Sequence, residues 1–317
     1  MLITARVIFT TMAALVSIVP VALTVSKLLA QERRHGSNLD AEAIGKAAGT
    51  RAVSSEDGTV GIRWPRDDVT VVVDNMPIKP FAGLASVAAF HSSRHGAMVM
   101  GDMVVFQDEV SAAMDAAFEN GLEVTALHNH FAFDEPKVYF MHIGGSGDAL
   151  KLAAGVKSIW DAIKDVRSVS AQPADSFPGS TPDANGVPDA ARIEQILGRR
   201  GRAQGGVVMI TIGRTGRMDG TAIGESMGVS TTIAFAGTNE NGVVYGDFIM
   251  TAAEVQPVLK TLRQDDIHIV ALHNHMIGEQ PPFFFAHFWR KGQIESLAAG
   301  MKAALDAQQA TKTDVRR

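Results

Sequence analysis

The 317-residue chain has no cysteine and no excess of basic residues. Without cysteine there can be no disulfide framework, no thiolate nucleophile and no site for lipid attachment at an export signal. The 29 lysines and arginines stand against 34 acidic residues and give a net charge of −5. Proteins that bind nucleic acid normally carry a basic surface, so nucleic acid is not expected as a partner.

Histidine, in contrast, is concentrated in one motif that occurs twice. The letters ALHNH at residues 126–130 return at residues 271–275. A third histidine follows at the same distance in both copies, at His142 and at His287. Six of the ten histidines belong to these two triplets, so the triplets are the main indication of function.

The residues around each motif predict a β-hairpin. Leu122–Leu127 is apolar and β-branched, which predicts a strand that carries His128 and His130 on one face. Asp134-Glu135-Pro136 signals a turn, and the β-prone run Val138–His142 would return beside that strand. Phe283–His287 matches this run in the second copy.

Three imidazoles that converge in this way can bind one divalent ion, with nitrogen–metal distances of about 2.0 to 2.1 Å and an open fourth position. The sequence therefore predicts two three-histidine metal sites, with zinc as the first choice of metal. The ligands would be His128, His130 and His142 in the first copy, and His273, His275 and His287 in the second.

A metal ion with three neutral ligands could acidify a bound water or polarise a carbonyl, and a proton acceptor would then be needed nearby. Asp134 and Glu279 occupy equivalent positions in the hairpin turn and are the first candidates for general acid or base, with Glu135 next. The alternative is that these carboxylates are solvated or orient a histidine. Asp102 and Asp247 could line a site too, although a Gly-Asp pair is more typical of a turn.

The chain is a tandem duplication of one unit. From Gly101 to Gly155 the matching residues of the second copy lie 145 positions later, and Asp40 to Gly49 recurs at an offset of 149. In the numbering of the first unit, the sequence predicts a helix (40–48), strands near 69–73, 85–90 and 97–105, and a second helix (108–119). The hairpin and a closing helix (148–165) follow, and the second unit is expected to have the same order. This is an α+β fold with a mostly antiparallel sheet and flanking helices. Two such copies are expected to pack about a pseudo-twofold axis.

The ends and the middle of the chain differ from the repeats. Residues 1–30 predict a secretory signal, with an apolar run from Val7 to Val25 and cleavage near Ala30. The alternative is an uncleaved anchor, which would be the one contact with a membrane, and either way the folded part is expected in the periplasm or outside the cell. The first repeat domain spans 38–167, a Pro/Ser-rich linker 168–188, the second repeat domain 189–308 and a polar tail 309–317.

The paired ALHNH motifs, the Gly-Asp followed by Glu-Val, and His287-Phe288-Trp289 before a final Leu-Ala-x-Gly helix resemble the LppY/LpqO family of exported bacterial proteins of unknown function. The chain departs from that family in lacking the lipoprotein cysteine. Lys137 and Pro282 stand where an arginine would be expected after the motif's proline, which leaves an anion-binding role for that position without support.

A more distant resemblance is to acetolactate decarboxylase, whose zinc is held by HxH and a third histidine on a strand hairpin. It implies a related fold and carries over only the six histidines. Three functions are compatible with the sequence. The first is a metal-dependent hydrolase or lyase acting on a small carbonyl or ester substrate, and the second is a non-catalytic envelope protein that binds metal or a small ligand. The third is a cupin-type metalloenzyme, because Glu135 follows HxH at nearly the cupin spacing, although a helix at 108–119 argues against it.

Overall fold

The computed structural model describes residues 39–314, so the predicted export signal at residues 1–30 lies outside the described residues. From Leu39 onward the chain forms one compact unit. No helix within the described range is long and apolar enough to cross a membrane. The first half contains α2 (Ala41–Ala48), β1 (Ala52–Ser54), β2 (Val60–Pro65), β3 (Val72–Val73), β4 (Met76–Pro77), η1 (Pro80–Ala82), β5 (Ala85–Ser93), β6 (Gly96–Phe106), α3 (Val110–Glu119), β7 (Glu123–His128), β8 (Asp134–Glu135), β9 (Val138–Gly147) and α4 (Ala149–Val169).

The second half repeats this order, with a two-stranded ribbon in place of the small strands β3 and β4. Its elements are α5 (Ala190–Leu197), β10 (Arg202–Gln204), β11 (Val207–Gly213), β12 (Gly216–Met218), β13 (Thr221–Ile223), η2 (Glu225–Met227), β14 (Ser230–Gly237), β15 (Gly242–Thr251), α6 (Ala252–Gln264), β16 (His268–His273), β17 (Phe283–Gly292) and α7 (Ile294–Asp314).

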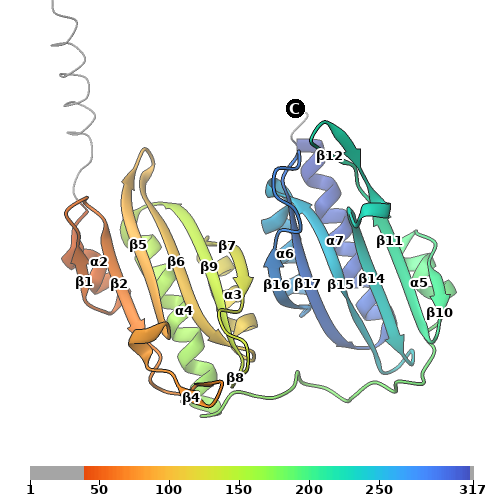
Figure 1. Ribbon diagram of the computed structural model, residues 1–317, viewed down its shortest axis with the longest axis horizontal. Helices are drawn as coiled ribbons and strands as arrows, with labels where there is room; N and C mark the ends of the chain where they lie inside the picture. The colour runs from red at the N-terminus through yellow and green to blue at the C-terminus, as the bar shows by residue number, and fades with distance from the viewer. Residues whose placement is uncertain (1–38, 315–317) are drawn as a thin grey trace, which may run out of the picture. The chain divides into compact units, whose positions relative to one another are not determined.

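The main strands form one 12-stranded antiparallel sheet in the order β1-β2-β5-β6-β9-β7-β16-β17-β15-β14-β11-β10. Read from either outer edge, the order of equivalent strands is the same, so the halves are related by a pseudo-twofold axis between β7 and β16. In each half the helices lie on one face of the strands (Figure 1). The mixed α+β architecture with a largely antiparallel sheet and two repeats is therefore confirmed.

Local sequence explains these elements well. In β2, Val60, Ile62 and Trp64 are buried and alternate with residues that face away from the helices, which is the pattern of a strand with one covered face. The α2 helix starts where the Asp40 side chain accepts a hydrogen bond from a backbone N–H, and it ends at Gly49 in the left-handed conformation.

Side chains from both halves reinforce the junction between β7 and β16. The Gln256 side chain accepts a hydrogen bond from the backbone N–H of Val124 (3.1 Å) and donates one to its carbonyl (2.8 Å). Arg263 forms a two-point ion pair with Asp115, with N–O distances of 2.9 and 2.8 Å. In addition, one continuous apolar core runs beneath both halves of the sheet.

Some predicted boundaries are wrong. The strand expected at 69–73 is reduced to β3, because Val69 and Val71 are buried in a loop that packs on Phe106 and Phe140 rather than in the main sheet. The outer strands β1 and β2 were not predicted. The final helix continues to Asp314, past the start of the expected tail. Because α3 and the other helices cover one sheet, this architecture does not fit the double-stranded β-helix of a cupin.

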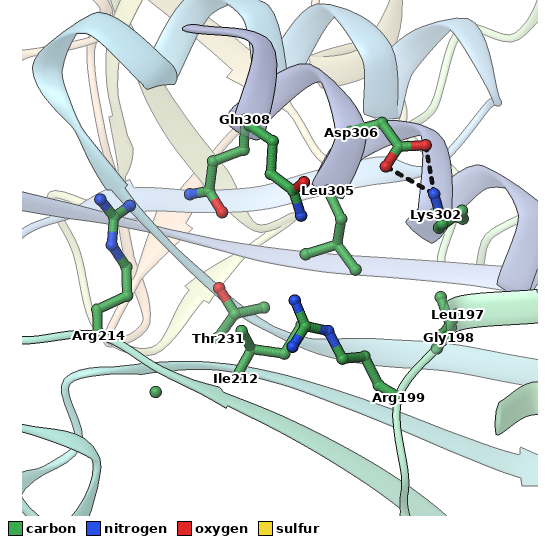
Figure 2. A pocket seen from close by; sticks show the side chains of 12 residues that line it. Leu197, Gly198, Arg199, Ile212, Arg214, Thr231, Lys302, Leu305, Asp306 and Gln308 are labelled. Atoms are coloured by element: carbon green, nitrogen blue, oxygen red, sulfur yellow. Dashed lines mark hydrogen bonds and ion pairs between the residues drawn. The ribbon is translucent and has the colours of Figure 1, made fainter. Parts of the chain in front are cut away.

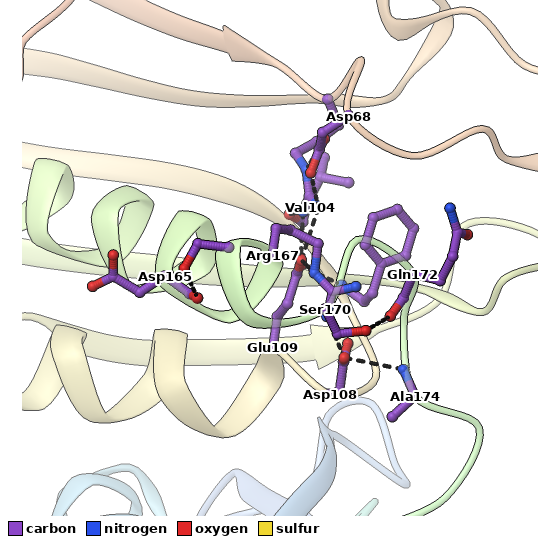
Figure 3. A network of polar contacts seen from close by, with 12 residues as sticks. Asp68, Val104, Asp108, Glu109, Asp165, Arg167, Ser170, Gln172 and Ala174 are labelled. Atoms are coloured by element: carbon purple, nitrogen blue, oxygen red, sulfur yellow. Dashed lines mark hydrogen bonds and ion pairs between the residues drawn. The ribbon is translucent and has the colours of Figure 1, made fainter.

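The linker between the repeats has no regular structure but is attached at several points. Phe177 stacks on His268 with ring centroids 4.1 Å apart. Lys291 donates to the carbonyl of Gly179 (3.2 Å), and Asn241 donates to that of Thr181 (3.0 Å). Ala174 also donates to the Asp108 side chain in the first half (3.0 Å, Figure 3), so the linker packs against both halves, although its composition alone indicated only a connection.

Glu109 and Glu254, which lie at the starts of α3 and α6, are buried ion-pair partners. Glu109 is fully buried and pairs with Arg66 at 2.7 Å. Arg167 reaches the same carboxylate from the end of α4 (2.8 Å) and also pairs with Asp108 (Figure 3). Burial raises the pKa of Glu109, although the Arg66 guanidinium opposes that rise. This network connects the end of α4 to the start of α3.

Candidate metal centre

Each histidine triplet is assembled at one end of a strand pair. His128 is the last residue of β7 and pairs with Phe140 of the adjacent strand β9, and His142 lies two residues further along β9, opposite Ala126. His130 lies two residues past the end of β7, so the prediction that both motif histidines lie on the strand is wrong in this detail. A β-bulge at Thr125 re-aims the end of β7. The second half repeats this arrangement, with a bulge at the equivalent position of β16.

The imidazole rings of the first triplet converge. The rings of His128 and His130 have centroids 5.2 Å apart, and those of His128 and His142 are 5.1 Å apart. The Nε2 atoms of His128 and His142 approach to 3.0 Å. Two nitrogens bound to one tetrahedral ion would be about 3.3 Å apart, given the usual zinc–nitrogen distance. The three rings each offer one nitrogen, and these atoms lie within 4.8 Å of one another.

The second triplet has the same geometry. The ring of His273 lies 5.0 Å from that of His275 and 4.9 Å from that of His287, measured between centroids. One nitrogen from each ring again falls within 4.8 Å of the others. The Nδ1 atom of His273 is buried and has no hydrogen-bond partner among the described residues. Such an orphaned nitrogen fits a group whose partner is a metal ion.

A phenylalanine supports the outer histidine of each triplet. Phe140 stacks on His130 with centroids 3.3 Å apart, and Phe285 stacks on His275 at 3.5 Å. Burial lowers the pKa of His130, with Asp102 opposing the shift, and burial likewise lowers the pKa of His275. Both shifts favour neutral imidazole, which is the form that binds a metal.

The carboxylates nearest the triplets are Asp102 and Asp247, and the prediction of a turn at these positions is wrong. Asp102 lies within β6, directly opposite His142, with its Oδ1 atom 3.9 Å from Nε2 of that histidine. Asp247 lies opposite His287 on β15 and approaches Nε2 of His275 to 3.4 Å. In both aspartates Oδ1 is buried without a hydrogen-bond partner among the described residues.

The glycine before each aspartate allows this placement. Gly246 has φ +156°, and a Cβ atom there would lie 1.9 Å from the carbonyl oxygen of Thr232 on the next strand. Only glycine therefore allows β15 to pass so close to β14 beside Asp247.

Burial raises the pKa of Asp247 to about 6, and the charge of His287 opposes the rise.

The carboxylates that the sequence predicted to be catalytic lie in the hairpin turns. Asp134 is buried and accepts a hydrogen bond from the backbone N–H of Val138 (2.7 Å), and Glu279 accepts one from Phe283 (2.8 Å). Each carboxylate therefore stabilises the turn between the two strands that carry its histidine triplet. Glu135 is an exposed residue of β8. A role for these three in proton transfer stays a prediction, and Asp102 and Asp247 stand closer to the imidazoles.

The surroundings of the two triplets differ. Beside His142 the open face of the sheet forms a hollow of about 530 Å³ whose walls include Arg51 and Arg63. Beside His287 a groove of about 490 Å³ is lined by Tyr245 and Trp289. The first hollow therefore presents positive charge, whereas the second presents aromatic rings.

Sequence reasoning considered Asp102 and Asp247 for the site but favoured a turn at these positions. The signal that could have found them was the repeat itself, since both copies keep an aspartate at this position. Their assignment to a turn rested on local composition. Only the pairing of β6 with β9 and of β15 with β17 places them opposite a histidine.

Comparison with known proteins adds a family. The family model described as "Domain of Unknown Function (DUF1259)" matches residues 42–162 and 191–307. The chain belongs to this family and contains two tandem copies of its unit. No curated protein matches the chain.

Solved structures were compared as well. The chain is similar to the trimeric bacterial microcompartment shell protein PduB, with 9% identity over 84% of this chain and 93% of that one and a TM-score of 0.19. For EtuB from Clostridium kluyveri the identity is 13%, the coverage 82% and 92%, and the TM-score 0.21. These TM-scores are too low to support any conclusion.

Proposed function

We propose that this member of the DUF1259 family is an exported metalloprotein that holds one divalent ion, zinc in first place, in each half, and acts as a hydrolase or lyase on a small carbonyl or ester substrate. The observation that carries the proposal is the convergence of three histidines in each half, with ligand atoms within 4.8 Å of one another. The repetition of this geometry is difficult to explain by packing alone.

The accessibility of the triplets favours catalysis over a purely structural metal. Two histidines of each triplet are half-buried and the third is exposed, so a ligand can reach the centre. Structural zinc sites have four protein ligands and are closed, whereas catalytic sites have three and leave one position for water or substrate. The resemblance to the acetolactate decarboxylase site points in the same direction.

Asp102 and Asp247 would supply the proton chemistry. A divalent ion with three imidazole ligands acidifies a bound water or polarises a substrate carbonyl. The unpartnered Oδ1 atoms of the two aspartates face this position and can accept a proton there or provide a fourth ligand. The more distant Asp134, Glu135 and Glu279 are the second group to test for this role.

The deciding experiment is metal content per chain in protein purified without a histidine tag. We expect two zinc ions per wild-type chain, and one each in His128→Ala and in His273→Ala. His91→Ala serves as the matched control, because His91 is exposed and belongs to neither triplet. If the rings only hydrogen-bond to one another, wild type will bind no metal, and the proposal fails.

The alternative is a non-catalytic envelope protein that binds metal or a small ligand in the accessible triplets. An assay of zinc-loaded protein for hydrolysis of small esters and for decarboxylation of keto acids distinguishes the enzyme from the non-catalytic protein. We expect Asp102→Asn with Asp247→Asn to retain zinc but lose at least 100-fold in rate, as is typical for removal of a general base. Inactive but zinc-loaded wild type would favour the alternative.

A further inference from the structure

The second half contains a cavity on the helix-covered face of its sheet (Figure 2). It has a volume of about 300 Å³, with Ile212 and Thr231 from adjacent strands on one side and Leu305 of α7 on the other. The neighbour of Thr231 in the sequence, Thr232, pairs with Asp247. Because successive strand residues point to opposite faces, the cavity and the second histidine triplet lie on opposite sides of the sheet.

In the first half two tryptophans fill the corresponding space. Trp64 pairs with Ser86 as Ile212 pairs with Thr231, and Trp160 is the counterpart of Leu305. The two indole rings stack with centroids 5.5 Å apart. The replacement of both tryptophans by smaller side chains therefore opens the cavity in the second half.

An arginine at the edge of the cavity also differs from its counterpart. Arg66 and Arg214 are equivalent, since their backbone N–H groups donate to the carbonyls of Leu84 and Val229, which lie 145 residues apart. In the first half the guanidinium is 1% exposed and enclosed, whereas that of Arg214 is 15% exposed and lines the cavity.

The ion pairs of these arginines explain the difference. Arg66 is paired with both Glu109 and Asp68, and the latter binds through two oxygens at 2.9 and 3.0 Å. Arg214 pairs with Glu254, and among the described carboxylates it has no second partner. The residue at the position of Asp68 is a glycine. Arg214 therefore lacks the second carboxylate contact that Asp68 gives to Arg66, while Glu254 balances its charge.

Two further cations line the cavity. Arg199 extends into the space between the strands and α7 (Figure 2), and its side chain makes no ion pair or hydrogen bond with another described residue. Lys302 is paired with Asp306 at the rim. Since Glu254 balances Arg214 and Asp306 balances Lys302, Arg199 is the lining cation left without a counterion among the described residues, and the cavity favours an anion.

We propose that this cavity binds a small organic acid. Its carboxylate pairs with Arg199, and its apolar part lies on Ile212 and Leu305. Arginine is well suited to a carboxylate because its fork of N–H donors matches the two oxygens. The volume is at the lower end of the range for ligand pockets, which limits the ligand to a small molecule.

The test is calorimetric titration of metal-free protein with benzoate, and with benzyl alcohol as the uncharged analogue. Removing metal first ensures that a carboxylate bound at the histidines is not counted, so the result is independent of the proposed metal function. We expect one benzoate site per chain and at least ten-fold weaker binding of the alcohol. Absence of saturable benzoate binding, or equal binding of both compounds, would overturn the proposal.

Two variants locate the site. Arg199→Gln should weaken benzoate binding by ten-fold or more, because a charge-assisted hydrogen bond is lost, while Arg200→Gln, a change at an equally exposed residue that does not line the cavity, should have no effect. Leu305→Trp should abolish binding by filling the cavity, with the unfolding midpoint checked to show that the variant folds. If benzoate binds both Arg199→Gln and Leu305→Trp as it binds wild type, it does not occupy this cavity.

Discussion

The two halves of the molecule share a strand order, a histidine triplet and an opposed aspartate, but they differ in how the space around these features is filled. In the first half Trp64 and Trp160 stack beneath the sheet, and Arg51 and Arg63 line the hollow beside the triplet. In the second half the corresponding space beneath the sheet is an open cavity, and Tyr245 and Trp289 line the groove beside the triplet. The repeated features include those that assemble the candidate metal centre.

This difference indicates that the two centres are suited to different ligands. A hollow with two arginines favours a substrate with an acidic group, whereas a groove with Tyr245 and Trp289 favours an aromatic or uncharged one.

The buried arginine–glutamate pair occurs in both halves, as Arg66–Glu109 and as Arg214–Glu254.

The largest expected effect comes from breaking these pairs. Glu109→Ala should lower the free energy of unfolding by about 3–5 kcal/mol, because it leaves Arg66 buried without its main partner and removes a partner of Arg167. Glu254→Ala should cost less, since Arg214 is nearer to solvent. Urea denaturation measures both, with the exposed Glu123→Ala as control. Equal losses for Glu109 and Glu254 would contradict the proposed difference between the halves.

An intermediate effect is expected from exchanging the side chains beneath the sheet. Trp160→Leu should reduce stability by about 2 kcal/mol, because it removes the ring that stacks on Trp64 and leaves a cavity. The reverse change in the second half, Leu305→Trp, should alter stability by less than about 1 kcal/mol, because a cavity is already present. A loss from Leu305→Trp as large as that from Trp160→Leu would show that the second half is tightly filled.

The smallest expected effect is the pH dependence of the junction between the halves. Burial lowers the pKa of His268 to about 4, with a further contribution from Arg263, and Nδ1 of this histidine lies 2.8 Å from the hydroxyl of Ser111. The unfolded chain therefore binds more protons than the folded one between pH 6.5 and 4. The stabilisation is complete above pH 6.5 and is lost as the pH falls towards 4.

After a reduction for partial solvent exposure, this loss amounts to about 1–2 kcal/mol. Urea denaturation at pH 7 and at pH 4.5 should show it in wild type and not in His268→Gln. The control is His91→Gln, a change at an exposed position, which should retain the wild-type dependence. A His268→Gln variant that keeps the full pH dependence would assign the effect to other groups.

Much of the architecture could be predicted from periodicity and from the repeat. The helices α2, α3 and α4 and the strands β5, β6 and β9 begin or end within a few residues of the predicted positions, because their buried faces and end signals are local. The six histidines were found because they occur twice with one spacing. The outer strand β2 was missed, since Gly61 and Arg63 interrupt its apolar residues.

The amino-acid order alone determined the duplication, the two histidine triplets and the absence of cysteine chemistry, because these are properties of composition and spacing. Only the tertiary structure decided that Asp102 and Asp247 face the imidazoles, that Glu109 is a buried ion-pair partner, and that β7 pairs with β16. These relations join segments far apart in the chain. Strand register and burial set them, and neither can be read from neighbouring residues.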